Sequence, residues 1–341
     1  MKNSPTIADW GEFGFIEALR ERLPKASGDL KLGIGDDAAW WTPAFDHGIL
    51  TTTDMLVEGV HFDLSYTSAA DLGYKSLAVN LSDLAAMGAS PSCVYLSLAL
   101  PVRLEKVWLE SFIGAFLLLA KEYGVQLAGG DTVQADQMVI SVTLCGLALS
   151  GKPILRGGAK VADDIYLSGT VGDSFLGLKL LQGGLQVPDA LNQSASFLKN
   201  RHLRPSPRIA LGEMLAASGA VSAMLDVSDG VIADLNHLLT AAGGLGAELD
   251  NIQLPLSPAG RHFLAAEQVD YASLLTGGED YELLFTASPK WRAQIEMISA
   301  KAAVNLTRIG RVTAVEGVFV MAEDGSRITL CIKGGYDHFQ P

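Results

Sequence analysis

Short acidic segments recur along this chain at the ends of apolar runs, and they constrain its fold more than any other feature. The first is Gly33-Ile34-Gly35-Asp36-Asp37-Ala38, which follows the apolar positions Leu30 and Leu32. Glycine allows a tight turn and the close approach of a ligand. Adjacent carboxylates repel each other unless water or a cation lies between them. The segment is therefore either an exposed turn or a place that holds a metal ion.

Five more segments combine a carboxylate with glycine, serine or threonine: Thr51-Thr52-Thr53-Asp54, Ser82-Asp83, Gly129-Gly130-Asp131-Thr132, Asp226-Val227-Ser228-Asp229-Gly230 and Gly277-Gly278-Glu279-Asp280. A single Asp is usually a turn residue or a helix cap, and Asp229 could simply cap the helix that we expect after it. Asp83 differs, because apolar neighbours predict a largely buried helix in which a carboxylate needs a positive partner. One shared cation cluster explains six such segments better than six coincidences, and these hard oxygen ligands suit Mg²⁺.

Several other site types do not fit the sequence. The pattern Gly33-x-Gly35-x-x-Ala38 matches a dinucleotide fingerprint on paper, but Pro43 prevents the helix that such a site requires. No phosphate-binding P-loop and no calcium-binding EF-hand spacing occur. No convincing hydrolase triad occurs either, so a phosphate site in this chain has to work through metal ions.

Composition bounds the class of protein. The chain has 341 residues, enough for two domains, and it is 49% hydrophobic with a formal net charge of −13. This charge, with no basic cluster, argues against nucleic acid as a partner. Apolar stretches are too short or interrupted to span a membrane. The three cysteines lie far apart and outside any metal or redox motif, which indicates a reducing cytoplasm.

Helical and strand patterns alternate irregularly, which predicts an α+β (mixed α/β) fold and not one doubly wound sheet. We expect a long helix over 68–88 with Ser68 as its cap, and a short strand over 125–128 that ends at Gly129. We expect another strand over 281–286. Glycines and a proline cluster around 150–158, and we place a domain boundary there, giving domains 1–150 and 151–341.

Four residues outside the metal set have both an ordinary and a functional interpretation. His61 is ordinary on local sequence alone, and Arg156 among glycines is either a surface residue or a phosphate contact. Glu279 can simply punctuate a turn. Tyr336 lies in an aromatic tail that can serve packing alone.

The segments together resemble those of the thiamine-monophosphate kinases, a family within the superfamily of aminoimidazole ribonucleotide synthetase and selenophosphate synthetase. The matching stretches run in order from end to end: 33–38 (GIGDDA), 52–62 (TTDMLVEGVHF), 80–91 (NLSDLAAMGASP), 129–132 (GGDT), 201–208 (RHLRPSPR), 225–230 (LDVSDG), 277–285 (GGEDYELLF) and 335–339 (GYDHF). Each stretch is weak alone, but jointly they are highly specific. One departure is mild: Thr52 stands where many relatives have Ser, and it keeps the hydroxyl.

The resemblance implies a two-domain fold like that of aminoimidazole ribonucleotide synthetase. The N-terminal domain would bind ATP and Mg²⁺ and pair with its copy in a homodimer. The C-terminal α/β domain would contribute acidic turns and substrate contacts. The implied activity is transfer of the ATP γ-phosphoryl group to thiamine monophosphate, giving thiamine diphosphate and ADP.

The resemblance also implies roles by position. Several Mg²⁺ ions would be held by Asp37, Thr52, Thr53, Asp54, Asp83, Asp131, Asp226 and Asp229, with the choice between Asp36 and Asp37 left open. ATP would contact Gly130, Asp131, Arg156 and Ser228, and thiamine monophosphate would contact His61, Glu279 and Tyr336. No residue acts as a general base, because a phosphate acceptor is already ionised near neutral pH. The alternatives are another ATP-dependent enzyme of the superfamily and a catalytically silent module that binds nucleotide or cations.

Overall fold

The computed structural model describes residues 6–34, 39–43, 48–148, 151–250, 254–266, 269, 271–321 and 327–329. The chain divides into two compact units. Unit 1 comprises residues 1–84 and 90–151, and unit 2 comprises residues 85–89 and 152–341. Within the described part of the chain, no helix combines the length and apolar content that a bilayer-spanning segment needs.

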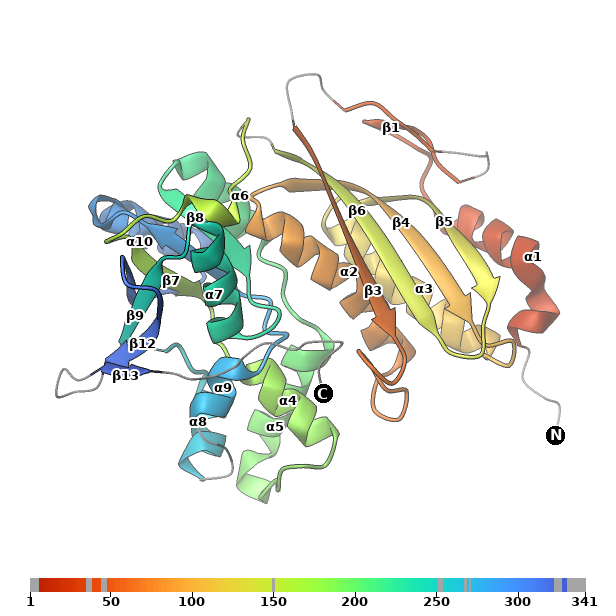
Figure 1. Cartoon of the computed structure of the whole chain (residues 1–341). Helices are drawn as coiled ribbons and strands as arrows, with labels where there is room; N and C mark the ends of the chain where they lie inside the picture. The colour runs from red at the N-terminus through yellow and green to blue at the C-terminus, as the bar shows by residue number, and fades with distance from the viewer. Residues whose placement is uncertain are drawn as a thin grey trace. The chain divides into compact units, whose positions relative to one another are not determined.

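Unit 1 is built on a four-stranded sheet in the order β3 (Gly48–Val57), β6 (Val139–Ala148), β4 (Ser90–Leu100) and β5 (Gln126–Gln134) (Figure 1). β4 and β5 run parallel, and the other neighbouring strands are antiparallel. Burial alternates along β6, where Ile140 and Val142 are buried and Ser141 is only half-buried. This period of two shows that one face of the sheet is covered more completely than the other.

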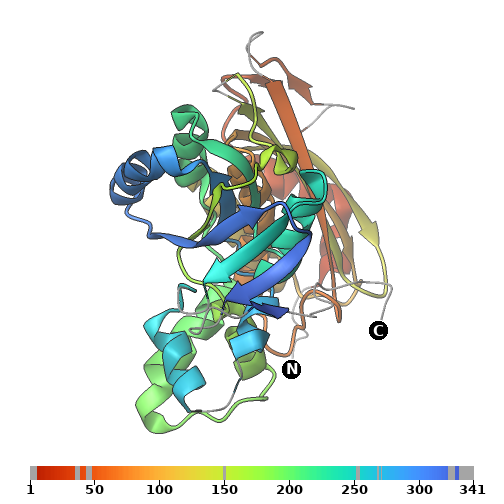
Figure 2. The same ribbon diagram turned by 60° about the vertical axis from the view of Figure 1, so that its left-hand side comes forward.

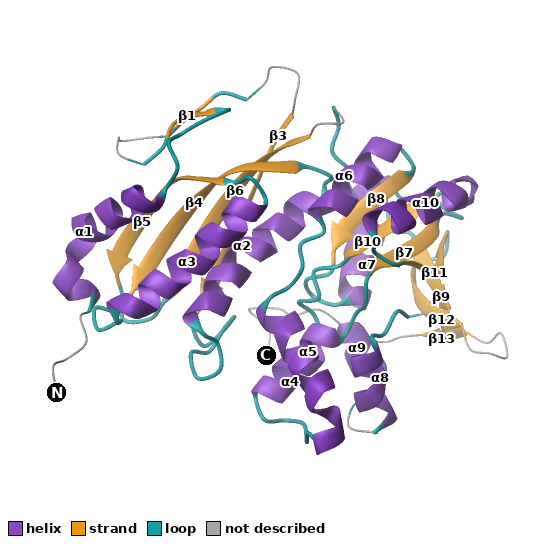
Figure 3. Ribbon diagram, turned by 180° about the vertical axis from the view of Figure 1, so that it is seen from behind, coloured by secondary structure: helices purple, strands orange, loops and turns teal. Residues whose placement is uncertain are grey.

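Helices α2 (Ala69–Ala86) and α3 (Lys106–Glu122) lie over the better-covered face (Figure 3). The Asp71 backbone N–H donates to the Ser68 hydroxyl at 3.1 Å, which confirms Ser68 as the cap of α2. Glycine allows α2 to approach its neighbours, because a Cβ on Gly73 would lie 2.1 Å from the Phe112 carbonyl oxygen of α3. Helix α1 (Ile7–Arg22) lies beside β5 (Figure 1).

The other face of this sheet carries a small hairpin of β1 (Leu30–Leu32) and β2 (Trp40–Trp41). Leu30 and Trp41 of the hairpin pack in one apolar cluster with Cys93 of β4 and Cys145 of β6. The hairpin therefore covers part of a face that the helices leave open.

Unit 2 contains a seven-stranded sheet whose members are, in spatial order, β13 (Arg327–Thr329), β12 (Gly317–Met321), β9 (Gly246–Asp250), β11 (Leu306–Thr313), β7 (Asp164–Ser168), β10 (Leu283–Ala287) and β8 (Val221–Asp226). β9 and β12 are parallel, and their teal and blue arrows lie side by side at the front of Figure 2. All other neighbours are antiparallel.

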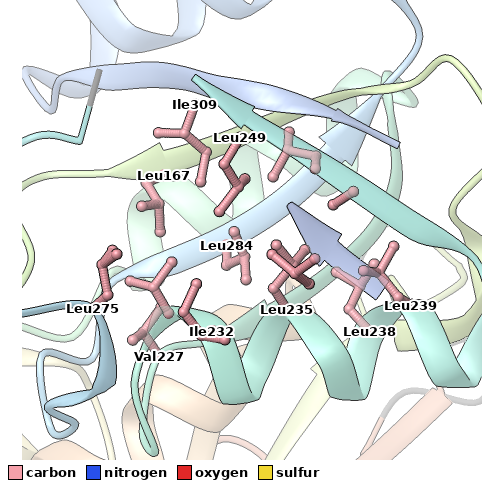
Figure 4. Close-up of a cluster of buried hydrophobic side chains, with 14 of the residues drawn as sticks. Leu167, Val227, Ile232, Leu235, Leu238, Leu239, Leu249, Leu275, Leu284 and Ile309 are labelled. Carbon is pink, nitrogen blue, oxygen red and sulfur yellow. The ribbon is translucent and has the colours of Figure 1, made fainter. Parts of the chain in front are cut away.

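Helix α7 (Val231–Ala241) covers one face of this sheet. Its side chains Leu235 and Leu238 are fully buried against strand residues such as Leu249 and Leu284 (Figure 4). Helices α6 (Ile209–Ser218) and α10 (Arg292–Ala302) lie on the other side of the sheet (Figure 3). A second cluster is formed by four helices: α4 (Asp173–Leu181), α5 (Asn192–Leu203), α8 (Pro258–Ala265) and α9 (Tyr271–Thr276). Single 3₁₀ turns occupy Arg156–Gly158, Asp189–Leu191 and Pro289–Trp291.

The α+β class is confirmed, and the helix expected over 68–88 is present, but two acidic segments expected at the ends of apolar runs lie inside strands. Asp54 lies within β3, Asp83 within α2 and Asp131 within β5. The expected end of a strand at Gly129 is wrong, because β5 continues in parallel register through Gly130, opposite Leu96. Glycine suits that position, since a Cβ there would lie 1.8 Å from the Leu96 carbonyl oxygen.

Two further expectations about unit 2 need correction. The strand expected from Tyr281 begins at Leu283, because Glu279 and Tyr281 have φ values of 65° and 52°. Helices α8 and α9 were not expected, since they have only 8 and 6 residues and carry little periodicity.

Candidate active site

In unit 1, three candidate residues meet on the helix-covered side of the sheet. Thr52 and Asp54 alternate with exposed residues along β3, and both are half-buried on the side of α2. The Thr52 hydroxyl donates a short hydrogen bond to the Asp83 carboxylate of α2. The strand period of two and the helix that crosses it therefore bring Thr52, Asp54 and Asp83 together.

The electrostatics of this group favour a cation. Burial and, as the smaller effect, the negative charge of Asp83 together raise the pKa of Asp54 to about 7. A divalent ion beside the two carboxylates would offset both effects, and a threonine hydroxyl is a compatible hard ligand. Thr52, Asp54 and Asp83 therefore fit the chemistry of a Mg²⁺ site.

Thr53 and Asp131 are not brought to that group. The Thr53 side chain lies on the opposite face of β3, where its hydroxyl is 3.0 Å from Thr143 Oγ1 and also donates to the Val142 carbonyl at 3.1 Å. Asp131 lies on β5, the opposite edge strand, in register with Ser97. Its carboxylate is exposed and accepts the Thr132 N–H at 2.8 Å. Gly130 precedes it in the same edge strand.

His61 lies in the turn that follows β3. Its Nδ1 accepts the Val57 backbone N–H at 3.0 Å, so the neutral ring carries its proton on Nε2. The ring is half-buried and its position is set by local backbone geometry, which leaves Nε2 as the group that can donate.

In unit 2, two loops lie side by side because β8 and β10 are antiparallel neighbours. The loop after β8 carries Ser228 and Asp229, and the loop before β10 carries Glu279. The Glu279 N–H donates to the Ser228 carbonyl at 2.8 Å, and the Tyr281 N–H donates to the Val227 carbonyl at 2.9 Å. Together with Asp226 at the buried end of β8, the candidate residues of both loops share one edge of the sheet.

Close backbone packing between the loops requires glycine. A Cβ on Gly278 would lie 2.2 Å from the Ser228 carbonyl oxygen, and a Cβ on Gly230 would lie 2.7 Å from the Thr276 carbonyl oxygen. Glu279 itself has positive φ, a conformation that is costly for a residue with a side chain. The glycines therefore serve the loop geometry that places Glu279 and Asp229.

Asp234 is a residue that our sequence reasoning missed. From the first turn of α7 its carboxylate accepts the backbone N–H groups of Ser228 at 3.0 Å and Asp229 at 2.9 Å. Burial raises its pKa to about 7, and the nearby charge of Arg156 acts in the opposite direction. The argument applied to Asp83 would have found it, because Asp234 is also a lone carboxylate in an apolar helix.

Glu279 has a buried neighbour on α5. His202 Nδ1 lies 3.4 Å from a Glu279 carboxylate oxygen and 3.0 Å from the Ser174 hydroxyl. The adjacent Asp280 is buried and accepts the N–H groups of Gly172 at 2.6 Å and Ser174 at 3.0 Å. Burial raises the pKa of Asp280 to about 7. The two acids of this segment thus differ: Asp280 anchors the loop, and Glu279 remains half-buried.

The arginines of the stretch 201–208 belong to a buried cluster of charged side chains around Glu282. Glu282, fully buried, accepts from Arg201 at 3.0 Å and from Arg208 at 2.7 and 2.5 Å. The Ser168 hydroxyl also donates to Glu282, at 2.6 Å. Two arginines on one buried carboxylate indicate a structural role, which keeps the loop before β10 attached to α5 and α6.

Two candidates, Asp37 and Tyr336, lie outside the described residues. Among the residues that the structure does describe, no three His, Cys, Asp or Glu side chains form a group that could hold a metal ion. Of the described candidates, Thr52, Asp54 and Asp83 form one group in unit 1, and Asp226 and Asp229 lie at one edge of the sheet in unit 2.

Two family models, one for each domain, match the two halves of this chain. The model of the N-terminal domain of AIR synthase related proteins matches residues 35–148, and that of the C-terminal domain matches residues 160–323. A thiamine-monophosphate kinase of Escherichia coli O157:H7 is 43% identical over 331 residues, 96% of this chain and 98% of its own.

Solved structures agree over the same length. The thiamine-monophosphate kinase from Stenotrophomonas maltophilia K279a has a TM-score of 0.80 at 39% identity and covers 92% of this chain and 96% of its own. A structure of "AaThiL complexed with AMPPCP and TMP" has a TM-score of 0.75 at 34% identity, covering 97% of this chain and 98% of its own.

Proposed function

This chain belongs to the AIR synthase related family and, within it, to the thiamine-monophosphate kinases, and from this premise we propose its chemistry. It is an ATP-dependent kinase that transfers the γ-phosphoryl group of ATP to thiamine monophosphate, giving thiamine diphosphate and ADP. The transfer is direct, depends on Mg²⁺ and completes the synthesis of thiamine diphosphate.

The observation that carries the metal part of the proposal is the group Thr52, Asp54 and Asp83. Its two carboxylates lie close enough for Asp83 to raise the pKa of Asp54, and the Thr52 hydroxyl bonds to Asp83. We assign Mg²⁺ ligation to this group. By resemblance we extend the assignment to Asp37, Thr53, Asp131, Asp226 and Asp229.

Both substrates are anions, so charge neutralisation is the main task of the site. Mg²⁺, when bound, supplies positive charge that screens the repulsion between the phosphates and stabilises the transferring phosphoryl group. The protein holds the carboxylates that retain the metal and orients the two substrates. No side chain has to remove a proton, because the second pKa of a phosphomonoester is about 6.

For ATP we propose contacts from Gly130, Asp131, Arg156 and Ser228. Arg156 is exposed on its 3₁₀ turn, and its guanidinium can form charge-assisted hydrogen bonds with a phosphate. The Ser228 loop is held by Asp234, which accepts the N–H groups of both Ser228 and Asp229. Asp234 thereby acts as a positioning residue for the nucleotide loop.

For thiamine monophosphate we propose contacts from His61, Glu279 and Tyr336. Thiamine carries a cationic thiazolium ring, and the half-buried Glu279 carboxylate has the opposite charge. The Nε2–H of His61 can donate to an acceptor on the substrate, because its Nδ1 is already occupied by the Val57 N–H.

We propose that domain 1–150 pairs with its copy in a homodimer and that domain 151–341 contributes substrate contacts. Support comes from the outer face of the unit 1 sheet, where Ile49, Met55 and Val133 are 54%, 58% and 52% exposed. These apolar side chains lie on β3 and β5, the two edge strands. Pairing with a second copy would remove these apolar side chains from water, which is favourable. The cysteine pattern supports a cytoplasmic location.

The proposal is tested by measuring Mg²⁺-dependent ADP release from ATP with thiamine monophosphate as acceptor. We expect ADP and thiamine diphosphate in equal amounts, and no turnover when either Mg²⁺ or the acceptor is omitted. ADP release with an unrelated acceptor at the same rate would favour another enzyme of the superfamily. Absence of any turnover with Mg-ATP would favour a silent binding module.

A further inference from the structure

Cys93 and Cys145 are direct partners across the antiparallel strands β4 and β6. Partner side chains of such strands point to the same face, and their Cα atoms lie about 4.5–5.5 Å apart. That separation falls within the range of about 4.4–6.8 Å that a disulfide spans. Both side chains are free thiols, and both are buried.

The two thiols are not equivalent. The neighbouring Cys93 thiol and, as a smaller effect, Thr51 Oγ1, 3.6 Å away, lower the pKa of Cys145 to about 6 against the opposing effect of burial. The proximity of Cys145, together with burial, raises the pKa of Cys93. A thiol with a lowered pKa thus lies directly across from a second thiol that can resolve its oxidised form, a feature of redox-sensitive cysteines that are paired with a resolving cysteine.

The pair lies beneath the β1–β2 hairpin. Leu30 and Trp41 pack in the same apolar cluster as Cys93 and Cys145. The two hairpin strands flank residues 33–39, which include the proposed metal ligand Asp37. A change at the thiols therefore alters the packing of Leu30 and Trp41, the two hairpin residues in this cluster.

We propose that Cys93 and Cys145 form a peroxide-sensitive dithiol that closes to an intramolecular cross-strand disulfide. The Cys145 thiolate attacks the O–O bond of a hydroperoxide; with hydrogen peroxide it releases hydroxide and becomes a sulfenic acid. Cys93 then attacks the Cys145 sulfur, forms the S–S bond and expels the second oxygen as water. Two thiols and one hydrogen peroxide thus give one disulfide and two waters.

Formation of the Cys93–Cys145 disulfide changes the packing under the β1–β2 hairpin. A disulfide fixes the sulfurs about 2.05 Å apart, much closer than a hydrogen-bonded thiol pair. It also consumes the Cys145 thiolate that interacts with Thr51, the residue next to the proposed ligand Thr52. We therefore expect the oxidised protein to bind Mg-ATP less well, a consequence that rests on the proposed function.

The disulfide is tested by treating the native, reduced full chain with hydrogen peroxide. The protein is then denatured in an alkylating agent and its peptides are mapped by mass spectrometry. The chain has three cysteines, so we expect alkylation of Cys331 alone and a cross-linked peptide pair containing Cys93 and Cys145. Dithiothreitol should restore alkylation of both.

Cysteine-to-serine variants show which cysteines form the cross-link. Cys331→Ser should give the same cross-link, and Cys93→Ser should give none while leaving Cys145 open to over-oxidation. Full alkylation of Cys93 and Cys145 after peroxide, or a link between two chains only, would overturn the proposal. Peptide mapping does not depend on kinase activity, so its result tests the disulfide independently of the proposed kinase reaction.

The functional consequence is measured as Mg-ATP affinity before and after oxidation. We expect a several-fold weaker affinity that dithiothreitol reverses in the wild type and in Cys331→Ser, and no change in Cys145→Ser, which lacks the attacking thiol. Unchanged affinity in a protein shown to carry the cross-link would overturn the link to the Asp37 segment.

Discussion

The two groups of candidate carboxylates are positioned by different means. In unit 1, Asp54 and Asp83 lie within a strand and a helix, and the alternation of β3 decides which side chain faces α2. In unit 2, Asp229 and Glu279 lie in loops whose backbone is held by buried carboxylates, among them Asp234. Regular structure can place a ligand without further support, whereas a loop needs an anchor.

This difference predicts opposite responses to charge removal. The unit 1 carboxylates repel each other, so their loss should affect function and spare the fold. The unit 2 anchors Asp234 and Glu282 are satisfied by N–H groups and arginines, so their loss should damage the fold first.

The largest effect is expected for Asp54→Asn or Asp83→Asn. Each substitution removes one negative charge from the proposed Mg²⁺ site. A bound metal ion supplies several kcal/mol of transition-state stabilisation, and this is lost when the site no longer holds the ion. Turnover should fall by about 10³-fold or more, since each 1.36 kcal/mol corresponds to a factor of ten. Steady-state kinetics measure this loss, and thermal unfolding should show no destabilisation. The exposed Asp136→Asn is the matched control, and a fully active Asp54→Asn would remove that residue from the site.

Glu282→Gln should have the next largest effect, on stability. It removes the charge that the buried Arg201 and the half-buried Arg208 share, and leaves Arg201 with Asp173, 4.0 Å away. Breaking a buried pair in this way costs about 3–5 kcal/mol. Urea unfolding measures the loss, with the exposed Glu296→Gln as control. Wild-type stability of Glu282→Gln would contradict the anchoring role.

Asp234→Ala should have an intermediate effect. Two half-buried backbone N–H groups lose their acceptor, at a cost of about 1–3 kcal/mol. Because the Ser228 loop loosens, KM for ATP should rise about tenfold while kcat changes less. Asp234→Asn keeps an amide oxygen as acceptor and should recover part of the affinity. Equal KM values for the alanine variant and the wild type would show that Asp234 does not position this loop.

The smallest effect concerns pH. Because the pKa of Asp54 is raised to about 7, the carboxyl group is protonated below that pH and must lose its proton to bind a cation. The apparent affinity for Mg²⁺ should fall about tenfold for each pH unit below 7 and level off above it. Mg²⁺ titrations of activity between pH 6 and 8.5 measure this. Equal affinity at pH 6 and 8 would contradict the assignment.

The sequence predicts the class of fold and the residue types of the site, because apolar periodicity and Gly-Asp spacing are local. It does not predict that β5 runs through Gly129 and Gly130, since that depends on pairing with β4, a non-local partner. Asp54 and Asp83 are separated by 28 residues, and only the packing of α2 on β3 joins them. The anchor Asp234 was missed although it is a lone carboxylate in an apolar helix, whereas Glu282 was missed because its burial against Arg201 and Arg208 is a tertiary feature.

The central claim is direct transfer of the phosphoryl group between the two substrates, and trapping of labelled phosphate tests it most directly. The full chain is incubated with Mg²⁺ and ATP labelled at the γ-phosphate, with and without thiamine monophosphate. We predict that the label passes to thiamine diphosphate when the acceptor is present and that none is retained on denatured protein when it is absent. Stoichiometric label on the protein, chased into thiamine diphosphate on addition of the acceptor, would contradict the account.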